Sequence, residues 1–205
     1  MGYVISVILG YLMGCSSMAY YIGKWKKQDV RQAGTGNLGA SNTAVLFGWG
    51  PAVAVAIHDI GKAFLAVLLC RWLFPELEYA GAAAGVASVL GHIFPCFLNF
   101  KGGKGMASYF GLVLALNWKL ALMVAVGIVL ITLITDFISL AAISMSLATP
   151  LYTIFISHNL FLALILAVGT VAMLYKHREN IVRIATHQEI GLRSTAKGKN
   201  RVDKE

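Results

Sequence analysis

The chain has 205 residues, of which 58% are hydrophobic and 13% charged, and its mean hydropathy is +0.73. A soluble domain carries about 25% charged residues, so this composition excludes a soluble globular protein and indicates an integral membrane protein of one domain. The net charge of +8 at pH 7 does not call for nucleic acid as a partner, because cations beside anionic lipid account for most of it.

Apolar runs divide the chain into seven segments, which predict an all-α integral membrane fold with seven transmembrane helices. The segments are 3–23, 51–71, 80–98, 105–116, 120–135, 138–156 and 160–175. The fourth is too short for a full crossing, which needs about 20 residues, so we expect a half-helix packed within the protein. We expect residues 1–189 to form this single membrane domain and residues 190–205 to form a basic, polar cytoplasmic tail.

The lysines and arginines predict the orientation of the spans. With the N-terminus outside, all 17 of them except Lys62, Arg71 and Lys119 lie on the cytoplasmic side. We therefore expect the N-terminus outside and the C-terminus in the cytoplasm. The three cysteines are scattered without zinc spacing or an obvious disulfide pairing, and we expect neither a metal site nor another cofactor.

Three polar stretches on the cytoplasmic side contain residue types that bind phosphate: glycines with exposed backbone N–H groups, small hydroxyls, amides and cations. The first stretch, residues 29–42, contributes Gly34, Thr35, Gly36, Asn37, Ser41 and Asn42. The second, residues 91–105, contributes His92, Lys101, Gly102, Gly103 and Lys104. The third, residues 176–183, contributes His177, Arg178 and Asn180. Charged residues are costly at a membrane boundary, and glycine is a poor helix former. Their occurrence together in these stretches indicates one phosphate-binding site that faces the cytoplasm.

Two nucleotide-binding patterns have to be rejected, one for its structural context and one because it is incomplete. Residues 34–39 fit G-x-G-x-x-G, but the preceding segment is a membrane helix, so no βαβ unit is possible. Gly103 and Lys104 resemble the end of a P-loop, yet Leu98 stands where its first glycine should be, and Gly105 replaces the Ser or Thr that would hold magnesium. The sequence therefore argues against a nicotinamide or flavin site and against ATP hydrolysis.

Several of these residues also have a structural interpretation. Lys101 could equally anchor the membrane boundary, whereas the glycines around Lys104 favour function. His92 could be a hydrogen-bond partner between helices. Asp59 and Lys62 lie three residues apart in one span and could neutralise each other, although ionisable residues within a membrane are candidates for function.

Taken together, the three stretches resemble the bacterial membrane acyltransferase family that transfers a fatty acyl group from acyl-phosphate to glycerol 3-phosphate, giving lysophosphatidic acid. The first motif is matched over residues 29–42, the second nearly completely over residues 91–105, and the third over residues 177–183 with Glu189. The resemblance implies seven spans, an outside N-terminus and a place in the bacterial inner membrane. It implies acyl-phosphate, glycerol 3-phosphate and membrane lipid as partners, and no nucleic acid.

The implied reaction needs no covalent intermediate, because acyl-phosphate is a mixed anhydride whose leaving group is already activated. The protein then has to hold two phosphates together and aim the acceptor hydroxyl at the acyl carbon. Substrate binding is assigned to Gly34, Thr35, Gly36, Asn37, Ser41, Asn42, Lys101, Gly102, Gly103 and Arg178. Catalytic roles are assigned to Lys104 as a phosphate clamp, to His177 and Asn180 as groups that orient the glycerol part or the oxyanion, and to His92 as an organiser or acid–base group.

The chain departs from the family pattern at four positions. Thr35 replaces a serine, Val45 an arginine, Ala142 a small hydroxyl and His187 a glycine. The missing arginine and hydroxyl would both lie near the substrate phosphate. Two alternatives are therefore a diverged, non-enzymatic paralogue that binds phospholipid or phosphate, and an acyltransferase with another phosphorylated acceptor. A small-solute transporter is disfavoured, because the polar residues gather at one membrane face rather than at the midplane.

Overall fold

The computed structural model describes residues 1–189 and 191–193, and this part of the chain folds into helices with no strand. Two short 3-10 helices, Val30–Gln32 and Cys96–Leu98, lie in the connections. The α-helices are α1 (Gly2–Cys15), α2 (Met18–Trp25), α3 (Ala40–Phe47), α4 (Trp49–Leu73), α5 (Ala80–Ile93), α6 (Met106–Leu116), α7 (Trp118–Thr135), α8 (Ile138–Phe155) and α9 (Leu160–Ala185). The all-α class predicted from the sequence is confirmed.

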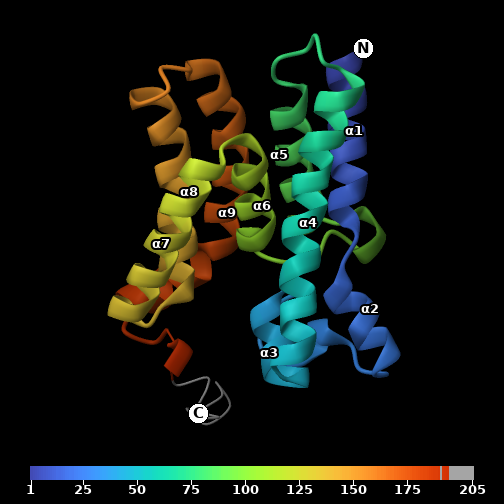
Figure 1. Cartoon of the computed structure of the whole chain (residues 1–205). Helices are drawn as coiled ribbons and strands as arrows, with labels where there is room; N and C mark the ends of the chain where they lie inside the picture. Colours follow the sequence, from blue (N-terminus) through green and yellow to red (C-terminus); the bar gives the residue numbers. More distant parts are fainter. Residues whose placement is uncertain (190, 194–205) are drawn as a thin grey trace.

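Six stretches of the described chain are long and apolar enough to cross a membrane, which makes the protein a multi-pass membrane protein. They are Gly2–Trp25, Trp49–Leu73, Ala80–Leu98, Trp118–Thr135, Ile138–Phe155 and Leu160–Ala185. The fourth predicted segment corresponds to α6, which is apolar but shorter than these. This helix lies in the middle of the bundle, between α4 and α5 on one side and α8 and α9 on the other (Figure 1).

The first apolar segment was expected to run unbroken, but the structure divides it into α1 and α2. Ser16 and Ser17 adopt extended backbone angles between the two helices, and the Ser17 hydroxyl accepts a hydrogen bond from Tyr20 N at 3.3 Å. Serine side chains compete with helical backbone hydrogen bonds and stabilise helix starts, which explains a break that the continuous hydropathy did not reveal.

Two further boundaries differ from the sequence-based prediction. The helix of segment 80–98 stops at Ile93, because Pro95 lacks the N–H that would continue the backbone ladder. The end of the first polar stretch, expected to be a loop, instead begins α3 at Ala40, and Gly48, at φ +84°, separates α3 from α4. Most of the predicted tail, residues 190 and 194–205, lies outside the described residues.

Glycines bring α1 and α5 into direct backbone contact. A Cβ atom added at Gly10 would lie 2.1 Å from Ala84 O, and one at Gly14 would lie 2.1 Å from Ser88 O. Helices in lipid gain no hydrophobic free energy by associating, so close packing of small residues supplies much of their attraction. Near the end of this contact the sulfurs of Cys15 and Cys96 approach to 3.8 Å, a proximity that the sequence did not indicate, and the two thiols remain free.

The main core forms around α6, where residues from α4 to α9 pack together. Tyr109 is fully buried, and its hydroxyl lies 3.2 Å from Thr170 Oγ1. Thr170 in turn donates to Ser146 O at 2.6 Å, so a short polar chain joins α6, α9 and α8 inside the bundle. Most buried hydroxyls in proteins are hydrogen-bonded, and this chain of contacts satisfies those of Tyr109 and Thr170, whereas the buried hydroxyl of Ser108, also in α6, has no partner within the described residues.

We expect Gly14→Ala to lower the stability of the purified protein by about 1–3 kcal/mol, because the added methyl meets the α5 backbone. Thermal unfolding followed by circular dichroism in one detergent measures the effect. Gly127→Ala is the matched control, since a Cβ at Gly127 of α7 meets nothing within 4 Å. Equal melting temperatures for the two variants would contradict the proposed packing.

Candidate functional site

The second polar stretch, which joins α5 to α6, contacts both of the other polar stretches; in Figure 1 it lies at mid-height, above α2 and α3. Gly103 of the second stretch packs against the Leu38 carbonyl of the first, where an added Cβ would lie 2.7 Å from that oxygen. Lys104 Nζ, next along the chain, donates to Asn180 Oδ1 of the third stretch at 2.6 Å. Leu38 and Asn180, which are 142 positions apart along the chain, therefore lie around the same two residues, Gly103 and Lys104.

Asn42 organises the first stretch from within. Its side chain is fully buried, and Oδ1 accepts a hydrogen bond from Thr35 N at 2.7 Å. Its Nδ2 donates to the carbonyls of Val30 and Ala33, at 2.9 and 3.2 Å. Gly34, at φ +59°, lets the chain turn over this amide. The Asn42 side chain therefore holds the loop in shape, whereas Gly34, Thr35, Gly36 and Ser41 are exposed and Asn37 is half-buried.

An ion pair fixes the start of the same stretch. Arg31 donates from Nε and a terminal nitrogen to the Asp29 carboxylate, at 3.0 and 2.9 Å, and its backbone N–H also donates to Asp29 Oδ1. The hydrogen bonds from Arg31 lower the pKa of the Asp29 carboxyl below its ordinary value. The Arg31 guanidinium also lies 6.0 Å from the centre of the Tyr20 ring, which ties the stretch to α2.

The glycines of the second stretch fold it back onto the end of α5. Gly102 N donates to Ile93 O at 3.2 Å, and Gly103 N donates to His92 O at 3.0 Å. A Cβ at Gly102 would lie 2.0 Å from His92 O, and one at Gly103 would lie 2.1 Å from His92 Nε2. From the sequence we expected these glycines to let a substrate approach the backbone closely. In the structure their backbone N–H groups are bonded to α5 carbonyls, and the His92 ring and backbone lie where side chains would be.

A buried polar cluster lies directly beneath the second stretch. Lys62 Nζ lies 2.8 Å from Asp59 Oδ1, 2.8 Å from His92 Nδ1 and 2.8 Å from the carbonyl oxygen of Ser16. Asp59, Lys62 and His92 are each at most 6% exposed. The expected pairing of Asp59 with Lys62 is present, and the contact of both with His92 was not foreseen. This burial favours the organising interpretation of His92 over the acid–base one.

The third stretch is held by Glu189. Its Oε2 accepts from Arg183 Nε at 2.7 Å, and its Oε1 accepts from Asn180 Nδ2 and from Ser139 Oγ, the latter at 3.0 Å. Partial burial acts to raise the pKa of the Glu189 carboxyl, but hydrogen bonds from these three donors outweigh it and lower the pKa below its ordinary value. Because Asn180 donates to Glu189, its Oδ1 is turned toward Lys104.

Ser139 was missed by sequence reasoning. It lies in the first turn of α8, outside the three stretches, and nothing around it suggests phosphate chemistry. The one available signal was its position three residues before Ala142, on the same face of α8, where the family pattern has a hydroxyl. Ala142 itself is 1% exposed and belongs to the core.

The other predicted site residues divide into buried and exposed groups. His177 is 2% exposed, and its Nδ1 lies 2.8 Å from Met173 O, an acceptor that selects the tautomer with hydrogen on Nδ1. Arg178 is exposed, and its guanidinium donates to the Tyr175 carbonyl and lies 4.4 Å from the centre of the Tyr175 ring. Lys101 is also exposed. The structure therefore joins Lys104 to Asn180 and leaves Arg178 and Lys101 on the surface.

These elements define a multi-pass membrane protein whose three polar stretches meet just before the start of α6. Residues 4–187 match the protein family described as glycerol-3-phosphate acyltransferase, so the chain belongs to this family. The resemblance seen in the three stretches is thereby confirmed. The match extends over all three of them up to His187.

Named relatives and solved structures agree with this membership. The glycerol-3-phosphate acyltransferase of Prochlorococcus marinus (strain MIT 9215) is 36% identical, covering 91% of this chain and 95% of that protein. The protein of the same name from Halorhodospira halophila is 38% identical, covering 91% and 94%. A crystal structure of PlsY, an integral membrane glycerol 3-phosphate acyltransferase, in its glycerol 3-phosphate form has a TM-score of 0.87 and 32% identity, covering 94% of this chain and 96% of that one. Its lysophosphatidic acid form has a TM-score of 0.84 and 31% identity, covering 93% and 95%.

We expect Glu189→Gln to lower the melting temperature at pH 7, because the ionised carboxylate accepts three side-chain hydrogen bonds. A lowered folded-state pKa stabilises the protein above the unfolded-state value of about 4.3, and this stabilisation is lost as the pH falls through the folded-state pKa. The difference between wild type and variant should therefore shrink on acidification below about pH 4.3.

Thermal unfolding of both proteins between pH 7 and pH 3 measures this dependence. Glu179→Gln is the control, because the Glu179 side chain is 70% exposed and its ion pairs are long, at 3.7 and 3.9 Å. A gap between wild type and Glu189→Gln that stays constant with pH would show that the charge of Glu189 contributes nothing.

Proposed function

We propose that the chain is an acyl-phosphate:glycerol-3-phosphate acyltransferase. An acyl group moves from acyl-phosphate to a hydroxyl of glycerol 3-phosphate, and the products are lysophosphatidic acid and inorganic phosphate. Membership of the family supports this proposal, and so do the names of the two PlsY structures, one in a glycerol 3-phosphate form and one in a lysophosphatidic acid form. The observation that carries the proposal is the contact of Lys104 with Asn180, which joins the second and third stretches in space.

The reaction requires a bond to form between the acceptor oxygen and the acyl carbon while the bond from that carbon to the phosphate oxygen breaks. The hydroxyl proton leaves with the phosphate, so no oxidant or cofactor takes part. Two phosphates meet in this step, and their repulsion has to be screened by fixed cations. We assign this screening to Lys104, whose ammonium is aimed by Asn180, and to Arg178 from the same turn of α9.

The remaining predicted residues take roles that fit their positions. In the first stretch the N–H groups of Thr35 and Gly36 are bonded within the loop, to Asn42 Oδ1 and Ala33 O. The N–H groups of Gly34 and Asn37 and the exposed hydroxyls of Thr35 and Ser41 are the donors that we assign to a phosphate. His177 uses Nδ1–H on the Met173 carbonyl, so its Nε2 is an acceptor in the neutral ring. We therefore assign His177 to orienting the acceptor hydroxyl, which has a hydrogen to donate, rather than the oxyanion, which has none.

We further propose that the chain crosses the bacterial inner membrane seven times, with the N-terminus outside and the site and C-terminus in the cytoplasm. The beginning of α1 and the end of α9 lie at opposite ends of the bundle, as an odd number of crossings requires (Figure 1). In this arrangement α6 would complete the seventh crossing together with the second stretch, which is shielded from lipid by the surrounding helices. The distribution of lysine and arginine supports the orientation.

A second candidate function keeps the transfer reaction and changes the acceptor. Val45 and Ala142 remove an arginine and a hydroxyl that the family pattern places near the substrate phosphate. The hydroxyl of Ser139 lies one helical turn from Ala142 but is bonded to Glu189, so it does not replace the missing group directly. A panel of phosphorylated polyols, each offered to the purified protein with acyl-phosphate, distinguishes the two candidates by which acceptor gives the highest kcat/KM.

We expect Lys104→Met to remove most of the acyltransferase activity in proteoliposomes. Loss of a charge-assisted hydrogen bond to phosphate costs about 1.5–3 kcal/mol, which corresponds to a roughly 10- to 150-fold lower kcat/KM. The assay measures lysophosphatidic acid formed from acyl-phosphate and labelled glycerol 3-phosphate. Lys119→Met, an exposed lysine at the other end of the bundle, should retain activity. Wild-type kcat/KM in Lys104→Met would overturn the assignment of the clamp.

We also expect acyl-phosphate, and not acyl-coenzyme A, to serve as the donor. The exposed loop and its cations suit a compact phosphate, whereas the G-x-G-x-x-G match lacks a βαβ unit and the P-loop pattern is incomplete. The same assay, run with each donor at equal concentration and equal chain length, compares their initial rates. Comparable rates with the two donors would refute this part of the proposal while leaving acyl transfer itself in place.

A further inference from the structure

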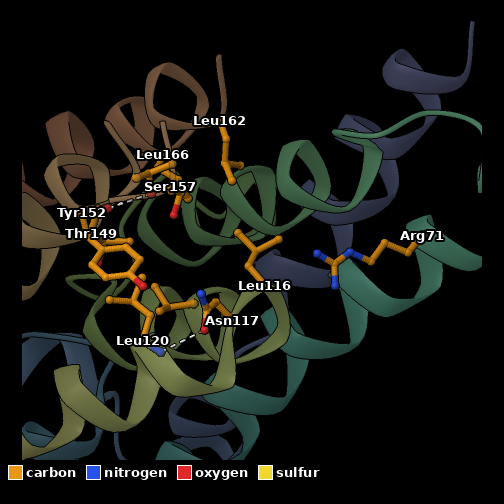
Figure 2. Close-up of a pocket in the computed structure, with 11 residues that line it drawn as sticks. Arg71, Leu116, Asn117, Leu120, Thr149, Tyr152, Ser157, Leu162 and Leu166 are labelled. Atoms are coloured by element: carbon orange, nitrogen blue, oxygen red, sulfur yellow. Dashed lines mark hydrogen bonds between the residues drawn. The ribbon is translucent and has the colours of Figure 1, made fainter. Parts of the chain in front are cut away.

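A cavity of about 120 Å³ lies at the end of the bundle opposite to the candidate site. Its walls come from the C-terminal ends of α4, α6 and α8 and from the N-terminal ends of α7 and α9 (Figure 2). These helix ends are far from the second and third polar stretches, which lie where α6 begins and α9 ends. The cavity is therefore not part of the proposed acyltransferase site.

Two of the polar side chains that line the cavity, Arg71 and Asn117, each make one hydrogen bond to the backbone at a helix end. Arg71 donates from one terminal nitrogen to Ala115 O at 2.8 Å, which satisfies a carbonyl at the C-terminal end of α6. Asn117 Oδ1 accepts from Leu120 N at 3.0 Å and so caps α7. The other guanidinium nitrogens of Arg71 and the Nδ2 of Asn117 are left as donors at the cavity (Figure 2).

Two hydroxyls add to these donors. Tyr152 and Ser157 both line the cavity, and neither side chain makes a hydrogen bond within the part of the chain that the structure describes. Ser157 is exposed and Tyr152 half-buried, so both hydroxyls are open to solvent and are free to donate to a ligand in the cavity.

The remaining walls are apolar, and the charge of the lining is positive. Leucines of α6, α7 and α9 supply most of the apolar surface, and no aspartate or glutamate occurs among the described residues that line the cavity. The acidic residues at this end, Glu76 and Glu78, lie in the connection after α4 and do not contribute to the lining. Hydrogen-bond donors and one cation beside apolar walls suit a phosphate that carries an apolar chain.

We propose that this cavity binds the phosphate headgroup of a phospholipid from the leaflet opposite to the candidate site. The flanking Trp72 and Trp118 are 76% and 64% exposed, and tryptophan at helix ends is typical of the membrane–water interface. The cavity therefore lies at the depth of lipid headgroups. A phosphate there contacts α4, the α6–α7 connection and α8 at once, and so links the two sides of the bundle between which α6 lies.

Asn117→Asp tests the proposal with the full-length purified protein. The carboxylate keeps an oxygen for Leu120 N, so the cap of α7 is preserved, but it replaces the Nδ2 donor with a negative charge. Asn159→Asp is the matched control, because Asn159 caps α9 in the same way through Leu162 N at 2.9 Å and does not line the cavity. Native mass spectrometry with short-chain phosphatidylglycerol gives the affinity of each protein.

We expect wild type and Asn159→Asp to bind phosphatidylglycerol equally and Asn117→Asp to bind it at least about tenfold more weakly. Equal binding by all three proteins overturns the proposal. If Asn117→Asp does not fold, Tyr152→Phe replaces it, since it removes only a hydroxyl that bonds nothing in the described chain. Retained affinity in Tyr152→Phe would then likewise overturn the proposal.

Two further ligands separate the sources of the signal. Short-chain diacylglycerol has the chains without the phosphate, and inorganic phosphate has the anion without the chains. Thermal stabilisation by phosphatidylglycerol that is sensitive to Asn117→Asp, with little effect of either partial ligand, supports a headgroup site. Equal stabilisation by diacylglycerol shows a site for chains only, and equal stabilisation by inorganic phosphate shows an anion site unrelated to lipid. Either result refutes the assignment to a phospholipid.

Discussion

The buried cluster of Asp59, Lys62 and His92 is the constraint on which the rest of the site depends. An ammonium and a carboxylate taken out of water are tolerated only as a well-bonded pair, so the three side chains fix each other's positions. His92 then presents its carbonyl and ring to Gly102 and Gly103, and Lys62 holds the Ser16 carbonyl at the break between α1 and α2. The glycine-rich stretch, and Lys104 after it, are thereby placed relative to three separate helices.

Composition and hydropathy were enough to predict the all-α membrane fold, because the free energy of transfer to lipid dominates long apolar runs. The break at Ser16 and Ser17 was not predictable from hydropathy, since two small hydroxyls barely change the average over a window of about 19 residues. Helix α3 was also missed. It is eight residues long, and a helix of that length owes its stability to tertiary packing rather than to a visible period.

The residue types in the sequence were enough to identify the three stretches of the site. The hydrogen-bond partners of individual side chains could not be predicted from the sequence. The side-chain amide of Asn42 could bind a phosphate, but in the structure it is hydrogen-bonded to the backbone of its own loop. Ser139 is an ordinary helix residue in the sequence and becomes part of the Asn180 support only when α8 packs beside α9. Both outcomes are decided by which buried polar atoms need hydrogen bonds, and that depends on the assembled fold.

The spacing of Asp59 and Lys62 on one helix has a consequence for how the protein enters the membrane. The two charges are three residues apart, so they pair as soon as α4 is helical, and the segment can pass into the bilayer without net charge at its centre. His92 belongs to α5, which is synthesised later, and joins a pair that is already neutral. If the only partner of Lys62 were in a later helix, α4 would carry an unpaired ammonium in the lipid until that helix was inserted.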